Sequence, residues 1–68
     1  MENLIEGLQR EMNRVREIIK DYEKICPDAG KMAIWMMKND IERAEKSIAS
    51  GYTIEMMICY RLLKEYEE

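Results

Sequence analysis

Residues 5–22 read IEGLQREMNRVREIIKDY, and the spacing of their apolar side chains decides the fold. Successive apolar positions lie three or four residues apart, which is the repeat of a helix that buries one face. These positions are Ile5, Leu8, Met12, Val15, Ile19 and Tyr22, and the stripe is widened by Leu4 and Ile18. The residues between them are mostly charged, so the opposite face is exposed to water. The pattern predicts a first helix over about residues 2–24.

A second helix is predicted over about residues 29–50. Pro27 turns the preceding residue away from helical conformation, and Asp28 is a suitable N-cap for the helix that follows. The repeat of three and four residues returns in Ile34, Met37, Ile41, Ala44 and Ile48. Around residues 32–37 the chain is apolar on every side of the helix. Such a turn must be covered from more than one direction, as in the middle of an assembly.

A third, shorter helix is predicted over about residues 54–66. Gly51 is a natural left-handed residue after the second helix, and Thr53 is a candidate cap for the third. One side of this helix carries Ile54, Met57, Ile58 and Leu62, and the other carries Met56, Cys59, Tyr60 and Leu63. Residues 64–68 are expected to fray. The chain is therefore expected to be all-α: a long helical hairpin plus a shorter third helix, in a single domain over residues 1–68.

Two of the three helices carry apolar residues on more than one face. A chain of 68 residues buries only about 60% of its extended surface, so its core is marginal. In a monomer the second faces would form a larger apolar patch than soluble proteins usually carry. We therefore expect a homo-oligomer, with Trp35, Met36, Met56 and Tyr60 at the contact between copies. The alternative is a monomer in which Trp35 anchors the core and flexible methionines fill its gaps.

The composition argues against several classes of function. Eleven basic and fourteen acidic residues give a net charge of −3, which is unfavourable for binding duplex DNA. No apolar run is long enough to cross a membrane, and no signal peptide opens the chain, so we expect a cytoplasmic protein. Cys26 and Cys59 form no disulfide or zinc framework and are expected to be reduced, partly buried thiols, with a redox pair as the alternative.

The chain has few side chains that are suited to catalysis. There is no histidine, and neither of the glycine-rich loops that hold nucleotide phosphates is present. Carboxylates such as Asp40 and Glu42 are two residues apart, so they do not share a helix face. We therefore expect no enzyme activity, no metal site and no cofactor.

The chain has more side chains that are suited to binding an anion. Arg10 and Arg14 form one i,i+4 pair of like charges on the first helix, and Arg16 and Lys20 form another. A phosphate would satisfy such pairs, because the guanidinium fork gives two parallel hydrogen bonds. Tyr52, in the turn beside Gly51, is the best candidate for an exposed contact aromatic. The predicted ligand residues are thus Arg10, Arg14, Arg16, Lys20 and Tyr52. The alternative is that the arginines pair with Glu6, Glu11 and Glu17 of their own helix, or with a partner helix.

Two stretches also resemble a group of known proteins. GLQREMNRVRE (residues 7–17) and IERAEKSIASG (residues 41–51) resemble short, all-helical proteins of phage and prophage genomes. The resemblance implies a phage accessory protein acting in the host cytoplasm. Small acidic helical proteins in that setting often block host defences, by gripping a host protein or by forming oligomers that sequester a nucleotide immune signal.

The main functional hypothesis is therefore a non-enzymatic, oligomeric helical binding protein that sequesters an anionic nucleotide. Two alternatives are an inhibitor that binds one host protein through the Met-rich and aromatic face, and a purely structural or regulatory interaction module.

Overall fold

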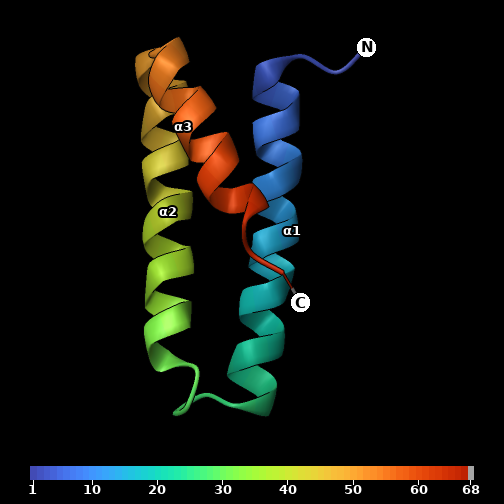
Figure 1. Cartoon of the computed structure of the whole chain (residues 1–68), viewed down its shortest axis with the longest axis vertical. Helices are drawn as coiled ribbons and strands as arrows, with labels where there is room; N and C mark the ends of the chain where they lie inside the picture. The colour runs from blue at the N-terminus through green and yellow to red at the C-terminus, as the bar shows by residue number, and fades with distance from the viewer. Residues whose placement is uncertain (68) are drawn as a thin grey trace.

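The chain forms three α-helices, and the computed structural model describes residues 1–67. They are α1 (Leu4–Ile25), α2 (Lys31–Ser50) and α3 (Thr53–Lys64). Figure 1 shows α1 and α2 as the two long arms of a hairpin, with α3 lying across its upper part. No strand occurs in the described part of the chain. The prediction of an all-α hairpin with a shorter third helix is confirmed.

The first helix begins two residues later than predicted because Asn3 caps it. The Asn3 side chain accepts a hydrogen bond from the Glu6 backbone N–H at 2.8 Å, and the Glu6 carboxylate accepts one from the Asn3 N–H at 3.1 Å. This reciprocal capping box satisfies two donors that a helix start leaves free. The helix ends at Ile25, directly before Cys26 and Pro27.

Two predicted caps are wrong. Asp28 does not cap α2, because Gly30 takes that position and no side chain caps the helix. Gly30 packs so closely that a Cβ there would lie 2.8 Å from Cδ2 of Tyr22, which leaves room for glycine alone. Thr53 is the first residue of α3 rather than its cap, and Tyr52 precedes it without a side-chain hydrogen bond.

The turn between α2 and α3 is built as predicted. Gly51 has a φ of 72°, the left-handed conformation that glycine adopts without strain. Its N–H and that of Tyr52 both donate to the carbonyl of Ser47, which closes the end of α2. The tight reversal brings α3 directly back against the hairpin.

The core lies between the three helices. It consists of Leu8, Met12, Val15, Ile18, Ile19, Ile34, Met37, Ile41, Ala44, Met56, Cys59 and Leu63. The predicted α2 seam faces this core, with Ile48 half-buried at its end. In α1 the centre of the predicted stripe and Ile18 at its edge are buried as predicted, whereas Ile5 at the opposite edge is 40% exposed. Of the two apolar sides of α3, the one with Met56 and Leu63 packs inward.

A close approach at Gly7 sets the position of α3 on α1. A Cβ at Gly7 would lie 3.2 Å from Cε2 of Tyr60, so the ring of this α3 residue rests against the bare backbone of α1. Tyr60 is half-buried there. The glycine that interrupts the helical pattern is therefore explained by packing within one chain.

The segment after α3 is anchored rather than frayed. Tyr66 is half-buried, and its hydroxyl donates a hydrogen bond of 2.6 Å to Oδ2 of Asp40 on α2. The prediction that residues 64–68 fray is wrong at Tyr66, because this tyrosine fills space beside the core. Glu68 lies outside the described residues.

We expect the Tyr66→Phe variant to lower the free energy of unfolding by about 1 kcal/mol at neutral pH, since one hydrogen bond is lost. Burial first, and then the hydrogen bond and charge of Asp40, raise the pKa of Tyr66. A group whose folded pKa is raised stabilises the fold below its unfolded pKa, about 10 for tyrosine, and loses that contribution as the pH rises. Urea unfolding between pH 7 and pH 11 measures this. The difference between wild type and variant should shrink above pH 10, whereas the exposed control Tyr52→Phe should match wild type throughout.

Candidate functional site

The four basic residues predicted to bind a ligand lie on two different sides of α1. Arg10 and Arg14 face α3, where both hydrogen-bond to residues of that helix or the segment after it. Arg16 is two residues beyond Arg14, which turns it by roughly 200° around the helix. It lies in a groove between α1 and α2 together with Lys20. The structure therefore does not gather the four into one site.

Arg10 is held by carboxylates of its own chain. Its Nε and Nη2 atoms donate to the two carboxylate oxygens of Glu2, at 2.9 and 3.0 Å, and Nη2 also donates to the Tyr60 hydroxyl at 3.2 Å. A further ion pair joins Arg10 to Glu11. Hydrogen bonding to Glu2, followed by that to Tyr60, raises the pKa of Arg10, and the same bond lowers the pKa of Glu2.

Arg14 closes the end of α3. Its Nη1 donates to the carbonyl of Tyr66 at 2.7 Å, and its Nη2 donates to the carbonyl of Leu63 at 2.9 Å. Leu63 is in the last turn of α3, where carbonyls have no partner within the helix, and Tyr66 follows the helix. The two bonds therefore cap the end of α3 and fix the segment after it to α1. Nε of Arg14 also donates to the carboxylate of Glu11 at 3.2 Å.

Glu11 lies between these two arginines and is buried, with its carboxylate paired to both. A buried carboxylate is tolerated where cations and hydrogen bonds compensate its charge. The alternative that the arginines pair with glutamates of their own helix is therefore correct for Glu11, which pairs with Arg10 and Arg14. Glu6 instead caps the helix with Asn3, and Glu17 lies 3.4 Å from Lys20. The geometry of Arg10 and Arg14 fits a structural role within the chain.

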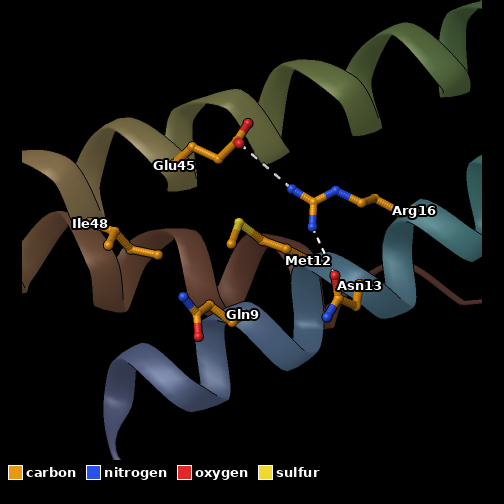
Figure 2. Close-up of a pocket in the computed structure, with 6 residues that line it drawn as sticks. All are labelled: Gln9, Met12, Asn13, Arg16, Glu45 and Ile48. Carbon is orange, nitrogen blue, oxygen red and sulfur yellow. Dashed lines mark hydrogen bonds and ion pairs between the residues drawn. The ribbon is translucent and has the colours of Figure 1, made fainter.

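The upper part of the groove between α1 and α2 is a polar hollow of about 420 Å³. Figure 2 shows Arg16 reaching from α1 toward Glu45 on α2, with Met12 and Ile48 beside the gap. Nη1 of Arg16 donates to Oδ1 of Asn13 at 2.8 Å, and Nη2 lies 3.6 Å from the Glu45 carboxylate. The amide of Gln9 completes the lining.

A second hollow of about 290 Å³ continues this groove, and Arg16 lines both. The α1–α2 groove is the two hollows together, lined by Gln9, Met12, Asn13, Arg16, Ile19, Lys20, Glu23, Lys38, Ile41, Glu45 and Ile48. Its three cations are Arg16, Lys20 and Lys38. Sequence reasoning missed Lys38, because only the pairing of α1 with α2 brings it beside residues of α1.

The ion pairs around this groove are weak. Lys20 lies 3.4 Å from Glu17 and Lys38 lies 3.2 Å from Glu23, and the side chains of both lysines are more than half exposed. Exposed pairs of this kind contribute about 0–1 kcal/mol, so a bound anion can displace them at low cost. Arg16 and Lys20 are therefore more available to a ligand than Arg10 and Arg14.

Tyr52 is exposed, as predicted, at the turn between α2 and α3. It lines neither hollow of the α1–α2 groove.

Of the four residues predicted at a contact between copies, two are exposed and two pack within the chain. Trp35 is 63% exposed and Met36 is 46% exposed, so Trp35 is not the core anchor of a single chain. Met56 is buried in the core, and Tyr60 packs against α1. Trp35 lines an open apolar hollow of about 570 Å³ with Asp28, Ala29, Lys31 and Met32.

The outward side of α3 adds exposed apolar residues that were not among the predicted interface residues. Ile54 is 76% exposed, and Met57 and Ile58 are also exposed. Their spacing already placed them together on one side of the helix. Which side faces water depends on how α3 docks.

Both cysteines are free thiols, Cys26 half-buried and Cys59 buried, and burial raises the pKa of Cys59. Within residues 1–67, no cluster of three or more His, Cys, Asp or Glu side chains is arranged to hold a metal ion. None of the three helices, as described, has the length and hydropathy of a membrane span.

No protein-family model, no curated protein and no solved structure matches this chain.

Proposed function

We propose that this protein is a non-enzymatic helical binding protein that acts as a homo-oligomer. The observation that carries the proposal is large apolar surface left uncovered in two separate places, either of which can meet a second copy: Met32, Trp35 and Met36 on α2, and Ile54, Met57 and Ile58 on α3. Within each group the side chains are three or four residues from a common member and therefore adjoin on the helix surface, and exposed apolar patches of this kind mark interaction sites. Each Å² of apolar surface removed from water contributes about 25 cal/mol, so burying this surface between two copies favours association.

We expect sedimentation equilibrium to give a mass that is a multiple of 8.2 kDa at micromolar concentration. Dilution should shift the mass toward that of one chain, because association through an exposed face obeys mass action. A mass of 8.2 kDa at every concentration would contradict self-association. In that case the same apolar surface would favour the alternative, a protein that binds a host protein.

Sequestration of an anionic nucleotide is a second candidate, supported by the α1–α2 groove. Arg16, Lys20 and Lys38 supply positive charge at one end, and the amides of Gln9 and Asn13 supply donors and acceptors at the other. Amide side chains of this kind can bond the edge of a base, while arginine binds phosphate. Such binding would fit a phage protein that removes a nucleotide signal.

Calorimetric titration with a panel of linear and cyclic nucleotides tests this second candidate. We expect the Arg16→Ala, Lys20→Ala double variant to weaken binding at least tenfold, because each lost charge-assisted hydrogen bond contributes about 1.5–3 kcal/mol. The double variant Lys24→Ala, Lys46→Ala removes the same charge from exposed positions outside the groove and should bind as wild type does. Equal weakening in both variants would point to non-specific attraction and count against a nucleotide site.

A further inference from the structure

The third helix is too short to cover the hairpin against which it packs. It has 12 residues, about 18 Å, whereas α1 has 22 residues, about 33 Å. The contacts of α1 with α3 and its tail run from Gly7, against Tyr60, to Arg14, which bonds the carbonyls of Leu63 and Tyr66. Beyond Arg14, α1 continues for about 16 Å. Figure 1 shows this lower part of the hairpin extending past the end of α3.

The uncovered part carries an apolar depression, which we call the notch. It has a volume of about 370 Å³ and is lined by Ile18, Asp21, Tyr22, Ile25 and Cys26. Ile25 is 79% exposed, and Tyr22 and Cys26 are half-buried. Asp21 is the one charged residue among these five. An apolar hollow with a single carboxylate favours an apolar partner that carries one cation.

The outer side of α3 has that chemistry. Met57 and Ile58 each lie three or four residues from both Ile54 and Arg61, and all four are exposed. They therefore form one continuous strip, which we call the α3 ridge. Met57 lies toward the side of α3 that packs on α1, roughly 60° around the helix from Tyr60. Arg61 lies about midway between Tyr60 and Glu55, which pairs with Arg43 of α2. Among the described residues, neither Asp21 nor Arg61 has an ion-pair partner.

We infer that the α3 ridge of a second copy fills the notch, and that the exchange is reciprocal across a twofold axis. This rests on the proposed self-association and names its surface. The two hairpins pack face to face and antiparallel, and the two third helices lie end to end between them. Each ridge then meets the other copy's notch, as an isologous contact requires.

The twofold arrangement is consistent with the charges of the two surfaces. A twofold axis across the hairpin leaves the α1 side of one copy opposite the α1 side of the other, so Arg61 approaches Asp21 of the second copy twice.

Charge reversal tests the inferred contact. We expect Asp21→Arg and Arg61→Asp each to raise the dimer dissociation constant about tenfold in sedimentation equilibrium, because each variant turns two attractions into repulsions. The double variant restores both pairs with opposite sign and should return to within about threefold of wild type. Both sites are exposed, and helical circular dichroism of each variant at dilution verifies that the fold is intact.

The outcomes separate this inference from the proposed function. The Asp21→Arg change raises the net charge from −3 to −1 and so reduces repulsion between copies. A general charge effect would therefore strengthen association, whereas the inferred contact predicts weakening. Ile58→Ser should also weaken the dimer, and Trp35→Ala should leave it unchanged. Loss of the dimer in Trp35→Ala with no effect at Asp21, Ile58 and Arg61 would overturn the ridge-in-notch contact but keep self-association. A monomeric wild type would overturn both.

Discussion

Replacing Leu63 with alanine is expected to lower the free energy of unfolding by about 2–5 kcal/mol, whereas the same change at Leu62 should lower it by less than about 1 kcal/mol. Leu63 is 0% exposed in the core, and its neighbour Leu62 is half-exposed. The first change leaves a cavity that the surrounding side chains fill only in part. The second removes a side chain that water already contacts.

Urea unfolding of the two variants at one protein concentration measures the difference. Leu63→Met, which nearly conserves volume, should lower the free energy of unfolding by less than about 1.5 kcal/mol and remains measurable if Leu63→Ala does not fold. Equal losses at positions 62 and 63 would mean that α3 presents both sides to the core equally. A larger loss at Leu62 would mean that α3 docks with its other side inward.

The second large effect is expected at Arg14. The Arg14→Ala variant should lower the free energy of unfolding by about 2–4 kcal/mol, because it removes charge-assisted hydrogen bonds to Glu11 and to the Leu63 and Tyr66 carbonyls. It also leaves the buried carboxylate of Glu11 with Arg10 as its remaining cation. Thermal unfolding reports the loss as a drop in Tm of roughly 4–8 °C for each kcal/mol.

Two matched variants locate the source of this effect. Arg16→Ala removes the same side chain from the same helix, but its contacts to Asn13 and Glu45 lie at the surface, so stability should change by less than about 0.5 kcal/mol. Arg14→Lys keeps the charge but cannot bridge two carbonyls and a carboxylate with a planar fork, so an intermediate loss is expected. If Arg14→Ala behaves like Arg16→Ala, the cap on α3 contributes little to the fold.

The three helices and most of the core could be predicted from the spacing of apolar residues, because helical periodicity is a local property. The seam from Ile34 to Ala44 is buried as predicted, and Gly51 ends α2 in the left-handed conformation. The errors occur at positions where another helix determines whether a side chain is buried. Ile5, at one edge of the α1 stripe, is exposed, whereas Ile18, at the other edge, is buried as predicted, because the neighbouring helices cover that second edge.

The candidate site could be predicted only in part. Arg10 with Arg14, and Arg16 with Lys20, are the same pattern in the sequence, and spacing along one helix cannot distinguish them. The docking of α3 on one side of α1 places Arg10 against the Tyr60 hydroxyl and Arg14 against carbonyls at the end of α3, and both pair with buried Glu11. Arg16 and Lys20 remain in a groove. Lys38 joins that groove from the other arm of the hairpin, a contact between residues far apart in the sequence.

By itself the sequence determined that this chain is helical, where its turns fall and that its apolar residues exceed what one face of each helix needs, since these depend on neighbours within a few residues. Only the tertiary structure decided which side of α3 faces water and which arginines make contacts within the fold. It also decided that α3 does not reach the lower part of the hairpin. The reason is physical: a helix with two apolar sides gains similar burial from either, so the choice between them depends on contacts made across the whole molecule, such as Tyr60 against Gly7 and Arg14 at the end of α3.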